Sequence, residues 1–314
     1  ISRGLVGSEM CIRDRYDILP PSIDSISIPI DSFIVLMEST PITFGFNEKV
    51  DSLDFVVSSK ALDSVEFDFI RGDSSLSVML QPPFASHDSI TINFSYLEDK
   101  AGLSTVDIAY TYTTPILGDY DFDSKITYND LWDLVENWEM KNFNYELGPV
   151  SGQVPHFISI PDSKFDIEDG MAFVQIWSWY QKEYGQIVED TVMIGKPLNI
   201  AQLGNQLSIF IDDSIASGQI QFSNNHIDSR LRFSTKSYDG AMYLSYQNPE
   251  KGYSILEFAR PKSMAKDTIH VTADEESKLK IYYKFYGRDK KEIQRGHTSF
   301  KHSTIPTLSL IHIS

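Results

Sequence analysis

Cysteine is almost absent, because the chain contains a single one, Cys11. It lies within Leu5–Arg15, whose letters LVGSEMCIRDR match a translated frame of a sequencing-library adapter, as do the letters LSLIHIS of Leu308–Ser314. We therefore expect residues 1–15 and 308–314 to be artefacts that say nothing about the fold. The natural fragment is expected to run from Tyr16 to Thr307 and to be open at both ends. It contains no cysteine, which excludes disulfides, thiol catalysis and cysteine-ligated zinc.

Positive charge and long apolar runs are also scarce. Lys and Arg number 27 against 44 Asp and Glu, a formal net charge of −17. Leaving out residues 1–15, with their three Arg, Glu9 and Asp14, brings the net charge close to −18. Such a chain repels nucleic acid and anionic membranes, and no apolar run approaches the roughly 18 residues of a membrane span. We therefore expect no nucleic-acid partner and no membrane span. The lack of cysteine is compatible with export and with the cytosol alike.

Strand-forming residues alternate with polar ones in two long segments, residues 20–114 and 188–304. Period-two alternation broken by turn residues predicts antiparallel sheets packed face to face. The clearest runs are Ile42–Phe46, Ile90–Phe94 and Ile108–Tyr112 in the first segment and Leu207–Ile211, Ser254–Phe258 and Lys280–Phe285 in the second. We predict a β-sandwich in each segment.

Between these segments, residues 117–184 change to a helical period, in which apolar residues recur at i, i+3, i+4 and i+7. The positions are Leu131, Leu134, Val135 and Trp138, and the last three recur about 39 residues later as Phe173, Val174 and Trp177. The sequence thus predicts two similar helices joined by a loop over Asn142–Ile160, which contains two Gly and two Pro. The predicted fold class is a mainly β multidomain chain with a small α-helical module between two sandwiches.

The first helix is preceded by twelve residues, Asp119–Asp130, that place oxygen atoms at positions 1, 3, 5, 9 and 12 of a loop. An EF-hand loop wraps calcium with this spacing, and calcium takes hard oxygen ligands. The predicted ligands are the carboxylates of Asp119, Asp121, Asp123 and Asp130, the hydroxyl of Thr127 or a water that it holds, and the backbone carbonyl of Lys125. Ser124 stands where such loops have Gly, and a β-carbon at positive φ costs on the order of 1 kcal/mol. We therefore expect weakened calcium binding, with a Kd of about 10⁻⁵ to 10⁻³ M. The alternative is a solvated acidic turn that only caps the helix.

The end of this loop recurs at the same offset of about 39 residues, because Asp123–Ile126 returns as Asp162–Phe165. At that offset, positions 5, 9 and 12 fall on Asp162, Asp166 and Asp169, and positions 1 and 3 fall on Ile158 and Ile160. Two carboxylates are therefore missing. We interpret the second loop as a structural mate in which Phe165 packs against Ile126 and Asp169 caps the helix. A degenerate metal site is the alternative.

A duplicated loop and helix with Asp at position 12 and no entering helix resembles the dockerin module of polysaccharide-degrading systems, over Gly118–Tyr180. The segment before it, with Pro41–Val50 and Leu97–Gly102, resembles bacterial immunoglobulin-like domains of surface proteins. The segment after it, with Ser217–Ser223, resembles cohesin-like folds. The resemblance implies calcium as cofactor, an extracellular or cell-surface location, and as partner a cohesin-like domain, including one in the same chain, or a polysaccharide.

Recognisable catalytic motifs are absent from the sequence, which has no nucleophile elbow, no phosphate-cradling glycine loop and no metalloprotease helix motif. We predict a non-catalytic interaction or spacer segment of a secreted or cell-surface bacterial protein, in which calcium rigidifies the central module. Two alternatives stay open. The chain is the accessory C-terminal region of a polysaccharide-degrading enzyme, or it is a dockerin that binds cohesin in another chain.

Overall fold

The structure is a computed structural model that describes residues 18–30, 32–187, 189, 192–204, 206–224, 230–235, 240–261, 266–273 and 278–301. The two segments expected to be adapter sequence lie outside these residues. The chain divides into two compact units: residues 1–84 with 88–113, and residues 85–87 with 114–314. The predicted helical module and the predicted second sandwich, 117–184 and 188–304, thus belong to one unit.

The first unit consists of two sheets packed face to face, as the alternation predicts. One sheet has the strand order β1 (Ile23–Ile26), β2 (Thr40–Phe46), β5 (Ser75–Leu80) and β4 (Phe67–Arg71), and the other contains β3 (Ser52–Ser59), β6 (Ser89–Glu98), β7 (Ser104–Thr105) and β8 (Ile108–Thr113). Alternate residues of β5 and β6 are buried in a common core, where the ring of Phe44 meets the ring of Phe94 edge-on at 5.0 Å. The predicted β-sandwich is present in this unit.

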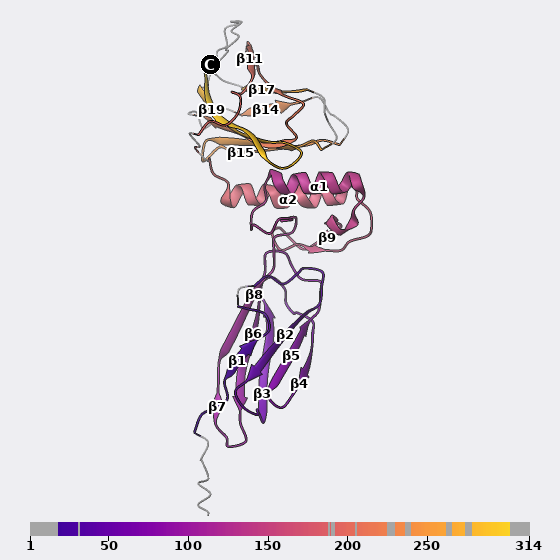
Figure 1. The fold of residues 1–314 in the computed structure, drawn as a ribbon, viewed down its shortest axis with the longest axis vertical. Helices are drawn as coiled ribbons and strands as arrows, with labels where there is room; N and C mark the ends of the chain where they lie inside the picture. The colour runs from indigo at the N-terminus through magenta and orange to yellow at the C-terminus, as the bar shows by residue number, and fades with distance from the viewer. Residues whose placement is uncertain are drawn as a thin grey trace, which may run out of the picture. The chain divides into compact units, whose positions relative to one another are not determined.

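The second unit contains two more sheets (Figure 1). The four-stranded sheet has the order β11 (Ile200–Leu203), β12 (Gln206–Ile211), β17 (Asp267–Ala273) and β14 (Leu231–Ser234). The five-stranded sheet has the order β15 (Met242–Asn248), β16 (Tyr253–Ala259), β13 (Ser217–Asn224), β18 (Lys278–Tyr286) and β19 (Glu292–Lys301). Phe222, Phe258 and Phe285 belong to the core between the two sheets. Every residue of β16 is buried, which indicates that both faces of this strand are covered.

Two helices cover the outer face of the five-stranded sheet (Figure 1). Helix α1 (Tyr128–Met140) contacts β13 and β16, and helix α2 (Ile167–Tyr184) contacts β15. The connection between the helices contains the short 3-10 helix η1 (Phe143–Tyr145) and a hairpin of β9 (Val150–Ser151) and β10 (Ile158–Ser159). No helix among the described residues is long and apolar enough to cross a membrane.

The predicted apolar faces of the helices are largely buried. Leu131, Leu134 and Val135 of α1 and Phe173 and Trp177 of α2 are at most 5% exposed. Val174, by contrast, is 36% exposed, whereas its counterpart Val135 is buried, so the repeated positions are not all buried in both helices. The mainly β prediction is confirmed, and the helical pair packs on the five-stranded sheet of the second sandwich.

Candidate functional site

Three of the predicted calcium ligands converge in the first loop. Carboxylate oxygens of Asp119, Asp121 and Asp123 lie within 4.8 Å of one another, with Asp119 buried and the other two exposed. The backbone closes around them because Ser124 adopts φ 64°, the left-handed conformation expected at this position of the loop. The backbone N–H groups of Asp123 and Ser124 donate to the two oxygens of Asp119, at 3.2 and 3.0 Å. The loop therefore presents carboxylate oxygens on its inner side.

Burial and mutual repulsion act on these carboxylates together. The pKa of Asp119 is raised to about 6, first by burial and then by the charges of Asp123 and Asp121, while the N–H donors of Ser124 and Asp123 act in the opposite direction. Three carboxylates at this separation repel one another, and a divalent cation would remove that repulsion. The donor set, all carboxylate oxygen, is the kind that calcium takes and not the nitrogen and sulfur set of zinc. These residues fit calcium.

Of the other three predicted ligands, Asp130 and Thr127 accept backbone N–H groups at the start of α1. Asp130 is completely buried, and its two oxygens accept the N–H groups of Tyr120 and Thr127, both at 2.9 Å. Thr127 is the N-cap of α1, so Asp130 and Thr127 form a capping box. Lys125 has its ammonium nitrogen 3.7 Å from Asp123. Burial, as the largest cause, raises the pKa of Asp130 to about 8. The structure thus brings together positions 1, 3 and 5, and it uses positions 9 and 12 to start the helix.

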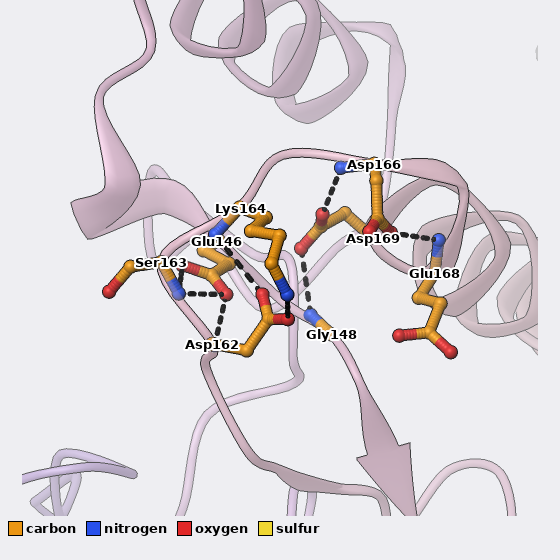
Figure 2. A network of polar contacts seen from close by, with 8 residues as sticks. All are labelled: Glu146, Gly148, Asp162, Ser163, Lys164, Asp166, Glu168 and Asp169. Carbon is orange, nitrogen blue, oxygen red and sulfur yellow. Dashed lines mark hydrogen bonds and ion pairs between the residues drawn. The ribbon is translucent and has the colours of Figure 1, made fainter.

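The second loop is closed by a residue that the sequence comparison missed, Glu146. Its carboxylate accepts the N–H groups of Asp162 and Ser163, the latter at 3.0 Å (Figure 2). Asp119 does the same for Asp123 and Ser124 in the first loop. Ser163 also has the left-handed φ, 63°, of its counterpart Ser124. Glu146 therefore occupies the role of position 1.

The helix start of the second loop repeats the first as well. Asp169 accepts the N–H groups of Leu147 and Gly148 on one oxygen and that of Asp166 on the other, all at 2.8 Å. Asp166 is the N-cap of α2 and forms the capping box with Asp169, as Thr127 does with Asp130. Segment 146–148 thus corresponds to 119–121. The thirteen residues 149–161, with the β9–β10 hairpin, stand where the first loop has only Phe122, which is an insertion of twelve residues.

This insertion corrects the alignment made at constant offset. The offset of 39 residues holds from position 5 onward, but positions 1 to 3 are related by 27 residues, as 119 is to 146. Ile158 and Ile160, which that alignment placed at positions 1 and 3, belong to the hairpin, with Ile158 in β10 and Ile160 directly after it. Phe165 stacks on Trp138 and Phe143 at 5.7 and 6.0 Å, and its packing against Ile126 stays a prediction. One signal in the sequence could have identified position 1 of the second loop: at the start of the connection an acidic residue, Glu146, lies two positions before a glycine, Gly148.

The second loop differs from the first in its charges. A β-carbon on Gly148, at position 3, would lie 2.8 Å from the backbone carbon of Glu168, so this position cannot carry a carboxylate without a shift of the start of α2. Lys164 forms an ion pair with Asp162, and this pair, as the largest cause, holds the pKa of Asp162 below its usual value. Asp162, Asp166 and Asp169 do not gather: among the described residues, the aspartate group of the first loop is the only acidic cluster with the spacing of a metal site. The second loop is therefore held together by hydrogen bonds and an ion pair of the protein.

The helical pair is attached to the five-stranded sheet by polar contacts as well as apolar ones. The indole N–H of Trp177 donates to Glu257 on β16 at 2.8 Å, and the hydroxyls of Tyr128 and Tyr286 lie 2.7 Å apart. Trp177 is 1% exposed and Glu257 is completely buried. Sequence reasoning placed Trp177 on the apolar face but gave no sign of its partner, because the two residues are 80 positions apart.

Comparison with known proteins gives limited further information. No family model matches the chain, and no curated protein matches it. A cohesin module from a family 33 glycoside hydrolase of Clostridium perfringens is similar over 35% of this chain and 96% of that module, with 14% identity and a TM-score of 0.26. The N-terminal part of the bacterial S-layer protein SbsC is 10% identical over 90% of this chain and 44% of its own length, with a TM-score of 0.23. The C-terminal domain of an antigen I/II-family protein of Streptococcus pyogenes is 8% identical over 86% of this chain and 94% of its own, with a TM-score of 0.18. At these TM-scores the likenesses carry no functional argument.

Proposed function

We propose that this chain is a non-catalytic, calcium-binding interaction or spacer segment of a secreted or cell-surface bacterial protein. The observation that supports the proposal is the convergence of Asp119, Asp121 and Asp123 within 4.8 Å, in a loop that leads directly into a helix. Calcium bound there would neutralise the repulsion among these carboxylates and stabilise the folded loop by mass action. The work of the segment is then mechanical or adhesive, and calcium is its structural cofactor.

The proposal extends to the kind of modules involved. In it, the first unit is an immunoglobulin-like sandwich, residues 117–184 are a dockerin-like module, and the sandwich that follows is cohesin-like. The contacts of Trp177 with Glu257 and of Tyr128 with Tyr286 favour a module docked inside its own chain, since they cover helix surface that a partner would need. A dockerin that binds cohesin in another chain is the less supported alternative. The accessory region of a polysaccharide-degrading enzyme is compatible with either arrangement.

Calcium titration of the full chain by calorimetry tests the proposal. Asp121→Ala removes an exposed carboxylate of the first loop, and Asp162→Ala is its matched control in the second. We expect one site with a Kd of about 10⁻⁵ to 10⁻³ M, lost in Asp121→Ala and unchanged in Asp162→Ala. The absence of both heat and thermal stabilisation at millimolar calcium would disprove the calcium function. Loss of binding in Asp162→Ala alone would show that calcium binds in the second loop and not in the first.

A further inference from the structure

A cavity of about 340 Å³ lies between the helical pair and the outer face of the five-stranded sheet, within the second unit. Its volume is at the lower end of the roughly 300–1,000 Å³ that small-molecule sites occupy. One wall comes from the last two turns of α2, with Tyr180 and Tyr184, and the floor comes from β13 and β16. The calcium loop contributes only its rim, through Lys125 and Thr127.

The wall of the cavity is aromatic and partly open to solvent. The rings of Tyr180 and Tyr184 lie 5.2 Å apart, and Tyr184 is 52% exposed although it lies beside a buried interface. Tyr282, which also lines the cavity, is only 8% exposed, so Tyr184 is the more open of these two rings. An aromatic ring at the mouth of a cavity offers a flat apolar face to a ligand that carries C–H groups on one side of a ring.

The floor of the cavity is a chain of buried hydrogen bonds. Gln221 donates to Gln219 at 2.6 Å, Gln219 donates to Glu257 at 2.7 Å, and Trp177 donates to the other oxygen of Glu257. Glu257 is completely buried, which raises its pKa to about 7, and it acts on the cavity through Gln219, which it holds in place. The side-chain amides of Gln219 and Gln221 line the cavity, and an amide both donates and accepts. Such a floor suits hydroxyl groups, which also donate and accept.

The charges around the cavity argue against an anionic ligand. Three cations line it, and each is already paired with a carboxylate: Lys125 with Asp123 at 3.7 Å, Lys284 with Glu292 at 3.7 Å, and Arg295 with Glu292 at 2.6 Å. An anion would have to displace these partners and would approach Glu257 as well. A neutral ligand meets neither cost.

We propose that this cavity binds one or two rings of a neutral carbohydrate, stacked on Tyr180 and Tyr184 and hydrogen-bonded through ring hydroxyls to the side-chain amides of Gln219 and Gln221, with Glu257 holding Gln219 in position from below. This activity goes beyond the calcium function and does not rest on it, because the aromatic wall and the polar floor belong to α2 and the sheet. The ligand class is set by three features together: flat aromatic faces, a donor and acceptor floor, and compensated charge.

The test is binding of the full chain to an array of neutral oligosaccharides of glucose, mannose, galactose and xylose, with uronate-containing and sulfated oligosaccharides beside them. The best neutral probe is then titrated by calorimetry. We expect Tyr184→Ala to weaken binding about five- to tenfold through the lost stacking face. Tyr184→Phe keeps the ring and is expected to stay within about twofold of the parent. Gln219→Leu removes the amide from the floor of the cavity and is expected to weaken carbohydrate binding about tenfold.

Met171→Ala provides the matched control, since Met171 is an exposed residue of the same helix and does not line the cavity. We expect it to bind like the parent chain. The proposal is overturned if no neutral oligosaccharide binds at millimolar concentration, if only the acidic probes bind, or if Tyr184→Ala binds as the parent does. Repeating the titration with chelator separates the two functions, because carbohydrate binding is expected to persist when calcium is removed.

Discussion

The two loops of the helical module have the same backbone hydrogen bonds but differ in the charged side chains beside them. In each, two consecutive N–H groups point at one carboxylate, a serine with left-handed φ turns the chain, and a capping box starts the helix. In the first loop that carboxylate is Asp119, with two further aspartates beside it. In the second it is Glu146, with Gly148 where the second aspartate would stand and a lysine beside Asp162. The comparison teaches that a carboxylate at position 1 and another at position 12 close each loop. The first loop differs by its two neighbouring carboxylates, on which the proposed calcium site depends.

The largest expected effect comes from removing the closing carboxylate of the second loop. Glu146→Ala removes a buried carboxylate that accepts the N–H groups of Asp162 and Ser163. Since a hydrogen bond to a charged group contributes about 1.5–3 kcal/mol, we expect a loss of about 3 kcal/mol in the free energy of unfolding. The measurement is urea unfolding followed by tryptophan fluorescence, which reports on the second unit because all four tryptophans lie in it.

Two further variants accompany this measurement. Glu250→Ala, which removes an exposed carboxylate of the same unit, is expected to change stability by less than about 0.5 kcal/mol. Glu146→Gln keeps an acceptor and is expected to fall between the two. A Glu146→Ala chain as stable as the parent would show that Glu146 does not close the loop.

The second effect in size concerns the position that separates the loops. Gly148→Ala places a β-carbon 2.8 Å from backbone of Glu168 and 3.0 Å from the nitrogen of Asp169, and we expect a loss of about 2 kcal/mol from the required shift. Gly170→Ala is the control within the same helix start, because its β-carbon meets only the ring of Trp138 at 3.5 Å, an ordinary contact. We expect Gly170→Ala to be neutral or to stabilise by up to about 1 kcal/mol, since alanine is the better helix former. Equal stability changes for the two variants would mean that close packing at Gly148 does not explain why position 3 of the second loop has no carboxylate.

The smallest effect is a pH dependence expected in the first loop alone. Since the pKa of Asp119 in the folded chain is raised to about 6, a proton competes with calcium below that pH, and calcium affinity is expected to fall about tenfold per pH unit there. Without calcium the sign is opposite for folding. The folded chain holds a proton that the unfolded chain releases, so stability falls as pH rises from the ordinary carboxyl pKa near 4 to about 6. Calorimetric titrations at pH 7.5 and at pH 5 check the first statement, and unfolding with chelator over the same range checks the second. Calcium affinity independent of pH would exclude Asp119 as a ligand.

Much of the fold could be predicted from the sequence because its signals are local. The alternation of apolar and polar residues predicted the strands β2, β6, β8, β12, β16 and β18. The spacing of Leu131, Leu134 and Val135 predicted helix α1 and its buried face. The first loop was equally local, with Asp119, Asp121 and Asp123 found together as expected. The positive φ of Ser124 also followed from its position in the loop.

What escaped prediction depends on residues far apart in the chain. Glu146 acts on Asp162 across 16 positions, and a search at one constant offset cannot see a repeat whose offset changes at an insertion. The bond from Trp177 to Glu257 and the cavity behind it arise only when a helix is packed on a sheet. Asp130 stays a predicted metal ligand, and its position number did not reveal that its oxygens accept the N–H groups of Tyr120 and Thr127.

The insertion in the second loop also has a consequence for a chain under tension. Thirteen residues, 149–161, lie between the two halves of a loop that Glu146 and Asp169 hold closed. Fully extended, they would span at most about 45 Å. A pulling force would have to separate Glu146 from Asp162 and Ser163, detach Leu147 and Gly148 from Asp169 and open the β9–β10 hairpin. The chain would then lengthen by less than this span without unwinding α1 or α2. The second loop thus contains extra chain that can extend under tension, and the first loop, which has no insertion, does not.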